Sequence, residues 1–241
     1  MDPLGGFAMI QLGAISPNVD RKFRRPRMWS NRELNRFSCL FKGDVVNVSA
    51  GDDVDKEGHC YRDYFLNCNS YTTTNYGPGL HRGFQGRDDE RLLDLCQPLP
   101  VELVRQFDTV FNHTTLEHVV NVGQAMENLC RLSRDVVILV VPFLQAQHET
   151  TGYRDYWRFT PTLLRHLFAE QGFDVIYESA NDERGSSVYI FQIASCHSGK
   201  WESLIPRQLL DQPVGDWLGQ SSSTRGGLRR LLSFWDRRKS A

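Results

Sequence analysis

Residues 107–160 read FDTVFNHTTLEHVVNVGQAMENLCRLSRDVVILVVPFLQAQHETTGYRDYWRFT, and this stretch decides the fold. Two apolar runs within it, residues 107–111 and 136–141, have the length of buried strands. Between them, residues 122–132 repeat apolar side chains at helical spacing. The second run is followed by Pro142, where we expect the strand to stop. A strand, a helix and a second strand in this order predict a parallel pair of strands.

The same alternation continues on both sides of this stretch. Apolar runs rich in β-branched residues predict further strands at residues 45–48, 70–75, 173–177 and 188–194. A polar turn separates the last two of these, which predicts a hairpin. Strands that alternate with helices and are apolar along their whole length indicate an α/β fold, in which helices cover both faces of a mostly parallel sheet.

Two helix starts carry recognisable caps. Ser30 and Glu33 fit a capping box, which predicts a short helix over residues 31–40. Thr160 is a good N-cap, followed by proline at the first helical position, and Gly172 is a good residue to end that helix.

The chain of 241 residues is long enough for one sizeable domain with terminal additions. We expect a basic N-terminal extension with a short helix in residues 1–40, the main domain in residues 41–195 and a C-terminal extension in residues 196–241. No apolar run reaches the roughly 18 residues that cross a bilayer. The mildly apolar N-terminus has no positive leading region and no clear cleavage site, so we predict a cytoplasmic protein without a signal peptide.

The formal net charge of −1 hides a segregation of charge along the chain. Residues 1–37 carry +4 and residues 225–241 carry +5, which leaves −10 on the middle of the chain. An acidic body argues against a nucleic-acid partner. Residues 228–235 have amphipathic helical spacing, for which we expect a solvated or self-docked helix; weak contact with an anionic membrane surface is the alternative.

The six cysteines form no C-x-x-C pair and no cluster with histidine that would suggest structural zinc. We therefore predict no metal site. Free thiols in regular structure usually behave as small apolar side chains, so we expect the cysteines to be reduced.

Small and polar residues follow two of the predicted strands. Ser49, Ala50 and Gly51 follow the strand at residues 45–48, and Asn75 stands at the end of the next strand. In an open α/β sheet, ligands bind at the carboxyl ends of the strands, where small residues allow a ligand to approach the backbone. Only Gly51 remains of a glycine-rich fingerprint, so an ordinary strand-to-helix turn would look much the same.

Four motifs in residues 107–160 follow one another at family-like spacing. Phe-Asp-Thr-Val at 107–110 precedes Leu-Glu-His-Val at 116–119, and the strand at 136–141 continues into Pro-Phe. His148 then precedes Asp-Tyr-Trp-Arg-Phe-Thr at 155–160. In these motifs the chain resembles class I methyltransferases that depend on S-adenosylmethionine (SAM), in particular a subgroup of those with the type-11 methyltransferase domain. The resemblance extends over roughly the central 150 residues.

The resemblance implies a Rossmann-like three-layer sandwich whose seven-stranded sheet contains one antiparallel hairpin strand, with SAM bound across the carboxyl ends of the strands. It also implies which residues bind the cofactor. These are Asn47, Ser49, Ala50 and Gly51 in the first loop, Asn75 at the ribose, Asp94 and Leu95 at the adenine, and Asn112 with His113 at the methionine end.

The sequence departs from the family pattern at three places. The first loop usually reads acid-x-Gly-x-Gly, but Asn47 and Ser49 replace the acid and the first glycine. Asn75 replaces the ribose acid, a change that we expect to weaken SAM binding by about 1–2 kcal/mol. Arg134 and Asp135 replace a glycine pair before the fifth strand.

Methyl transfer is an in-line displacement at a sulfonium, so the protein must align donor and acceptor, exclude water and, for a hydroxyl acceptor, remove a proton. Histidine is the usual base near neutral pH. We predict His148, on a loop after a strand end, as the catalytic base, with His113 as the second candidate. His118, at a predicted helix start, is expected to be structural.

The aromatic and basic residues near His148 suggest where an acceptor binds. Tyr156 and Arg158 are predicted to contact it, and the alternative for Arg158 is an ion pair with Asp155. Trp157 and Phe159 are expected to anchor the loop in the core.

Two kinds of function remain open from the sequence. The first is a SAM-dependent methyltransferase that acts on a small molecule or a glycan, at oxygen. The second is a non-catalytic binding module that keeps the fold but has a degenerate SAM loop, as the substitutions at Ser49 and Asn75 would allow. A nicotinamide-dependent oxidoreductase is disfavoured because the glycine fingerprint is missing.

Overall fold

The computed structural model describes residues 24–77, 82–150, 152–183, 185–211 and 218. The sheet consists of strands β1 (Gly43–Val48), β2 (Cys68–Asn75), β3 (Glu90–Leu92), β4 (Phe107–His113), β5 (Ser133–Leu144), β6 (Asp174–Ala180) and β7 (Val188–Ser195). The α-helices are α2 (Arg25–Phe37), α3 (Val122–Leu132) and α4 (Pro161–Glu170). The 3₁₀ helices are η2 (Ser38–Leu40), η3 (Tyr61–Tyr64), η4 (Val101–Leu103), η5 (Leu116–His118) and η6 (Ser198–Trp201).

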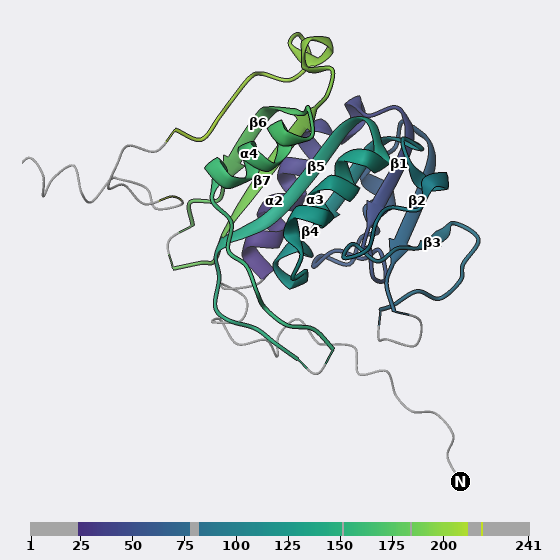
Figure 1. Ribbon diagram of the computed structural model, residues 1–241. Coiled ribbons are helices and arrows are strands. Elements are labelled where there is room, and N and C mark those ends of the chain that lie inside the picture. Colours follow the sequence, from purple (N-terminus) through teal and green to yellow (C-terminus); the bar gives the residue numbers. More distant parts are fainter. Residues whose placement is uncertain (1–23, 78–81, 151, 184, 212–217, 219–241) are drawn as a thin grey trace, which may run out of the picture.

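The strands form one seven-stranded sheet in the order β3-β2-β1-β4-β5-β7-β6, with α3 and α4 on one face and α2 on the other (Figure 1). The four pairings among β1 to β5 are parallel. The two pairings that involve β7 are antiparallel. The predicted mostly parallel sheet is therefore a mixed sheet, because the last two strands form a hairpin that turns β7 against its neighbours.

Strand β5 is the centre of the protein because its side chains fill a hydrophobic core on each face of the sheet. Val137, Leu139 and Val141 pack in the core that α3 and α4 cover. Val136, Ile138 and Val140 belong to the core under α2, with Leu34 and Phe37 of that helix. All six β5 residues are fully buried, which explains why the strand is apolar along its whole length.

Two predictions about element ends are wrong. Strand β5 does not stop at Pro142 but continues to Leu144, since Pro142 pairs with Tyr189 of β7 next to an irregularity in the ladder. Such an irregularity tolerates a residue without an N–H group. The capping box is also wrong, because α2 begins at Arg25 with a proline in its first turn. Ser30 lies inside this helix.

Other boundaries match the sequence. Helix α3 spans the predicted residues, and the Thr160 side chain accepts a hydrogen bond from the Leu163 backbone N–H at the start of α4. The short strand β3 is implied by the sevenfold strand count, but no local pattern marks it. All six cysteines are free, as expected. In the described part of the chain, no helix combines the length and apolar character that crossing a membrane requires.

Among the described residues, neither edge of the sheet offers a long open strand. At one edge, strand β3 is only three residues long. At the other edge, Gln208 forms an isolated parallel bridge with Tyr177 of β6. The Gln208 carbonyl accepts a hydrogen bond from Glu178 N at 2.7 Å, and its N–H donates to Ile176 O at 3.3 Å.

The amino ends of the central strands carry a network of paired charges. Arg134 Nη1 lies 3.1 Å from Asp44 and 3.0 Å from Asp108. The Asp108 carboxylate also accepts the Asp44 N–H, and it stands where a side chain on Gly43 would clash with it. Asp135 accepts hydrogen bonds from Ser195, Lys200 and Trp201. Arg134 and Asp135, the departures before the fifth strand, thus belong to the end of the sheet opposite to the predicted site.

Candidate functional site

A pocket of about 720 Å³ lies at the carboxyl ends of β1, β2 and β4. All the predicted site residues line it except Asn112 and Arg158. These lining residues are Asn47, Ser49, Ala50, Gly51, Asn75, Asp94, Leu95, His113, His148 and Tyr156. A volume of this size suits a small-molecule ligand or cofactor. The structure therefore brings together residues that are up to about a hundred positions apart in the chain.

The first loop holds the left-handed backbone shape that glycine usually supplies. Ser49 has φ of 58° and Gly51 has φ of 60°. Ser49, which replaces the first family glycine, thus adopts a conformation that is unfavourable for a residue with a Cβ atom. The backbone N–H groups of residues 49–51 donate to Thr74 and Asn75 of β2. Strand β2 therefore fixes the shape of this loop.

Asn75 is committed to the protein itself. Its Oδ1 accepts the Gly51 N–H at 2.8 Å, and its Nδ2 donates to Gly51 O at 3.1 Å and to Glu90 Oε1 at 2.6 Å. Burial alone would raise the pKa of Glu90, but hydrogen bonds from Asn75 and from the backbone of Gln85 and Arg87 outweigh it and lower this pKa. The lowered pKa keeps Glu90 ionised, and its carboxylate holds Asn75, the residue at the position of the usual ribose acid, in place.

Asn47 and Asp94 differ in how far their side chains are engaged. The Asn47 side chain donates a hydrogen bond to Asp53 Oδ1 at 2.8 Å. The same oxygen also accepts a hydrogen bond from the Tyr71 hydroxyl. Asp94 is half-buried, and one of its oxygens accepts the Cys96 N–H at 2.8 Å. Among the described residues, its other oxygen has no hydrogen-bond donor, so this oxygen can still accept a hydrogen bond from a ligand in the pocket.

Asn112 and His113, at the end of β4, are held by their neighbours. Asn112 is fully buried and donates to Val48 O at 2.9 Å. The two ring nitrogens of His113 lie 2.8 Å from Ser30 Oγ and 3.1 Å from Thr114 Oγ1. Burial lowers the pKa of His113 well below its ordinary value. His113 is therefore a neutral wall residue, poorly arranged to accept a proton from a ligand.

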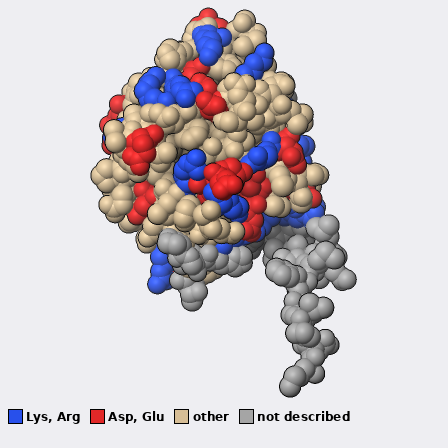
Figure 2. Space-filling view, turned by 90° about the vertical axis from the view of Figure 1, so that its right-hand side faces the viewer, with Lys and Arg blue, Asp and Glu red and all other residues tan. Residues whose placement is uncertain are grey.

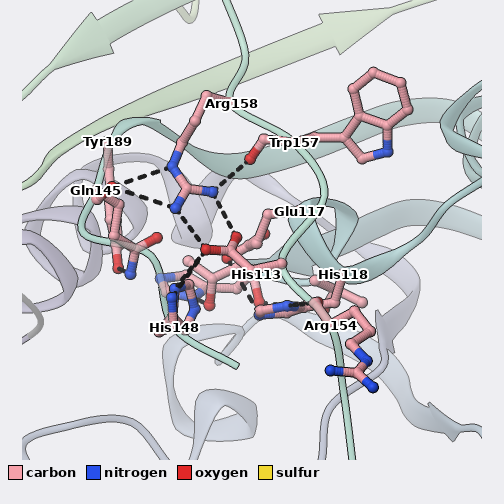
Figure 3. Close-up of polar contacts among 12 residues, drawn as sticks. His113, Glu117, His118, Gln145, His148, Arg154, Trp157, Arg158 and Tyr189 are labelled. Atoms are coloured by element: carbon pink, nitrogen blue, oxygen red, sulfur yellow. Dashed lines mark hydrogen bonds and ion pairs between the residues drawn. The ribbon is translucent and has the colours of Figure 1, made fainter. Parts of the chain in front are cut away.

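His148 also lines the pocket and is oriented by an acid. Its Nδ1 is 3.4 Å from Asp155 Oδ2, and its backbone N–H donates to the same oxygen at 2.9 Å (Figure 3). Burial would raise the pKa of Asp155, but hydrogen bonds from Arg158 and His148 outweigh it and lower the pKa to about 2. An ionised carboxylate behind an imidazole is the arrangement that orients a histidine base.

Arg158 forms the ion pair with Asp155 that was the alternative to a contact with the acceptor. Its guanidinium donates to both oxygens of Asp155, at 2.5 and 2.7 Å, and to the carbonyl oxygens of Gln145 and Trp157 (Figure 3). Tyr156, by contrast, is half exposed on the pocket wall. Phe159 is fully buried in the core. Trp157 is partly exposed, with its indole N–H bonded to Val119 O.

Several residues in the pocket wall or directly behind it were given no binding or catalytic role from the sequence. Glu117 and His118, at η5, face His148, and one ligand-type atom from each of the three lies within 4.8 Å of the others. Burial raises the pKa of Glu117 to about 7. Arg27 and Lys56 add positive charge to the lining. The sequence does not show these groups together, because they lie in segments that only the fold brings into contact.

The charged surface is mixed where it can be followed. On the face that contains the β3 edge, acidic and basic side chains lie next to one another (Figure 2). Ion pairs between Arg62 and Asp89 and between Arg82 and Asp52 contribute to this pattern. The described residues of this face form no continuous basic patch of the kind that binds nucleic acid. The predicted basic helix at residues 228–235 lies outside the described residues.

Solved structures share this fold at low sequence identity. A proposed methyltransferase from Bacillus halodurans C-125 aligns with a TM-score of 0.50 and 13% identity over 68% of this chain and 97% of its own. A proposed methyltransferase from Haloferax volcanii, solved with the Trm112 methyltransferase activator, aligns with a TM-score of 0.51 and 12% identity over 74% and 93%. No family model and no curated protein matches the sequence. The similarity shows that this chain shares the fold of these two methyltransferase structures.

Proposed function

We propose that this chain is a SAM-dependent methyltransferase that acts on a hydroxyl of a small molecule or a glycan. The observation that carries the proposal is the pocket at the carboxyl ends of β1, β2 and β4, in a sheet with the strand order of this fold. Ser49, Gly51 and Asp94 line one part of it, and His148 lines another. In this fold the ligand site lies at that edge of the sheet.

The lining suggests how the donor would lie. The adenosine would occupy the part of the pocket near Asp94 and Leu95, with the Asp94 carboxylate accepting hydrogen bonds. The methionine end would approach Arg27 and Lys56, whose positive charge suits the donor carboxylate. Bound SAM supplies the activated methyl group; the protein orients the donor, excludes water and removes the acceptor proton.

The base in this proposal is His148. Asp155 holds its Nδ1 side, which directs Nε2 away from that carboxylate. An imidazole held in this way would take the acceptor's hydroxyl proton as the oxygen attacks the methyl group. Tyr156 and Tyr153, both on the pocket wall, would contact the acceptor.

The test is calorimetric titration of the full chain with SAM and with S-adenosylhomocysteine. We expect Asp94→Ala to weaken binding by about tenfold to a hundredfold, because one carboxylate hydrogen bond contributes about 1.5–3 kcal/mol. Asp88→Ala, at an exposed position outside the pocket lining, is the matched control and should bind as the parent does. Equal affinities in the Asp94 and Asp88 variants would contradict the assignment of the adenosine end.

The non-catalytic binding module remains the second candidate because Asn75 and the first-loop N–H groups are already bonded within the protein. A ligand gains nothing from groups that must first break such bonds. No heat with either compound at millimolar concentration would favour this second candidate and overturn the first.

A further inference from the structure

We infer that Glu117, His118 and His148 bind a divalent transition-metal ion at the wall of the pocket. These three side chains, the Glu-His-His cluster, each present one ligand-type atom within 4.8 Å of the other two (Figure 3). His118 Nε2 lies 3.8 Å from Glu117 Oε1. Ligand atoms around tetrahedral zinc are about 3.3 Å apart, given metal–ligand bonds of about 2.0–2.2 Å. Small side-chain rotations therefore suffice to close the cluster around an ion.

Glu117 provides the strongest reason for a bound cation. It is fully buried, and neither of its carboxylate oxygens has a hydrogen-bond partner among the described residues. Buried carboxylates are normally paired, hydrogen-bonded or bound to metal, because leaving them bare costs several kcal/mol. The positive charges that reach Glu117 come from Arg27 and Arg158, and Arg158 is already bonded to Asp155. A directly bound ion would satisfy the carboxylate that these arginines leave bare.

Both imidazoles are oriented as metal ligands usually are. His118 Nδ1 lies 2.6 Å from the Arg154 carbonyl oxygen. His148 Nδ1 lies 3.3 Å from the Ala146 carbonyl oxygen and 3.4 Å from Asp155. Because these oxygens only accept hydrogen bonds, they favour the tautomer with the proton on Nδ1, which leaves Nε2 as the donor atom for a metal. Such an outer contact is typical of histidines that ligate zinc.

A second group of potential ligands lacks this feature. Asp135, Cys196 and His197 also come within 4.8 Å of one another. However, the Asp135 carboxylate already accepts hydrogen bonds from Ser195, Lys200 and Trp201. Its charge is satisfied without an ion, so this group serves as the internal control.

The metal site goes beyond the proposed methyltransferase activity and does not depend on it. His118 and His148 line the pocket, whereas Glu117 lies behind them, so the open coordination position would face the ligand. A metal there would bind the acceptor oxygen and lower its pKa. With the ion bound, His148 would be a ligand and could not also be the base, so the base role proposed above applies to the metal-free protein and the metal would activate the acceptor in the loaded one.

The test uses the full chain, free of affinity tag and stripped of metal with EDTA, in the absence of SAM. Calorimetric titration with Zn²⁺ and visible absorption with Co²⁺ should show one site. We expect Glu117→Gln, His118→Gln and His148→Gln each to weaken binding by at least about tenfold and to abolish the Co²⁺ spectrum of that site. His197→Gln, the matched control, should leave the affinity unchanged.

A second measurement needs no variant and so does not depend on their folding. Zn²⁺ should protect His118 and His148 from carbethoxylation by diethylpyrocarbonate, as mapped by mass spectrometry. His166, an exposed histidine of α4, should react equally with and without metal.

Three results would overturn the inference: no binding at millimolar Zn²⁺ or Co²⁺, unchanged affinity in the Glu117 and His148 variants, or equal reactivity of all three histidines with and without Zn²⁺. Titration of the same samples with S-adenosylhomocysteine separates this inference from the proposed activity. Metal binding without nucleoside binding would leave the cluster standing and contradict only the donor site.

Discussion

At one end of the central strands the charged side chains are paired, whereas at the other end a buried carboxyl group lacks hydrogen-bond partners in the described part of the chain. At the amino ends, Arg134 bonds to Asp44 and Asp108, and the Asp135 carboxylate has three hydrogen-bond donors. At the carboxyl ends, Glu117 is fully buried and lacks a hydrogen-bond partner among the described residues. The difference indicates where stability resides and where a ligand is expected, because a protein retains a buried carboxyl group without hydrogen-bond partners only at a cost to its stability.

The contrast also changes how the departures from the methyltransferase pattern should be interpreted. Arg134 and Asp135 replace a glycine pair, but they lie at the well-paired amino end, away from the proposed SAM site. Ser49 and Asn75 lie at the pocket in which that site is proposed. Each of the following predictions tests this division between the two ends.

The largest effect is expected at the amino end, from Asp135→Ala. This change removes the acceptor for the buried Ser195 hydroxyl and the Trp201 indole N–H, so we expect a loss of about 3 kcal/mol in the free energy of unfolding. Asp174→Ala, which breaks an exposed pair with Arg207, should cost less than about 1 kcal/mol. Urea denaturation of both variants makes the comparison, and equal losses would contradict it.

The Asp135 contribution should also depend on pH in a defined direction. Burial would raise its pKa, but hydrogen bonds from Lys200, Ser195 and Trp201 outweigh it and lower the pKa in the folded protein. The contribution is therefore complete above the unfolded value of about 4 and is lost as the pH falls through the folded value. The stability gap between parent and Asp135→Ala should be constant near neutral pH and narrow below about pH 4.

Replacing two buried glutamates should change the stability by smaller amounts and in opposite directions. Glu90→Met removes the acceptor for Asn75 and for the N–H groups of Gln85 and Arg87, and should cost about 2 kcal/mol. Glu117→Met removes a carboxylate without such partners, and in metal-free protein should be neutral or stabilising by about 1–2 kcal/mol. Thermal unfolding in EDTA measures both. A clear loss of stability in Glu117→Met would mean that this carboxylate is satisfied in some other way.

The smallest effect concerns the first loop. Ser49→Gly relieves a left-handed backbone, which costs about 1–2 kcal/mol, but also adds freedom to the unfolded chain. We expect a net gain of about 0.5 kcal/mol. Gly51→Ala, at a similar φ, should lose about 1 kcal/mol. Guanidinium denaturation measures the free energy of unfolding of both variants. A change of the same sign in both would contradict the idea that Ser49 is strained in this loop and Gly51 is not.

Sequence patterns revealed the elements whose periodicity is strong. Helix α3, helix α4 and the apolar core of β5 follow directly from spacing and caps. The sequence did not reveal β3, because three residues are too few for a period to show. The capping box at Ser30 failed because Pro26 starts α2 earlier and the Glu33 carboxylate accepts hydrogen bonds from Tyr177 and Ser179.

The candidate site was predictable in position but not in chemistry. Strand ends located the pocket, since the edge of a parallel sheet follows from topology alone. That Asn75 is bonded to Glu90 depends on how the chain between β2 and β3 folds back. The grouping of Glu117, His118 and His148 could not be predicted, because its members come from two segments thirty residues apart in the sequence and neither segment shows ligand spacing.

The bridge between Gln208 and β6 bears on how copies of this protein meet. An open strand edge is a template on which another chain can add a strand, and long bare edges promote aggregation. Here the N–H of Glu178 and the carbonyl of Ile176, on the outer side of β6, are already bonded to Gln208. At the opposite edge, β3 offers only three residues. Self-association of this chain should therefore proceed through side-chain surfaces rather than by extension of the sheet.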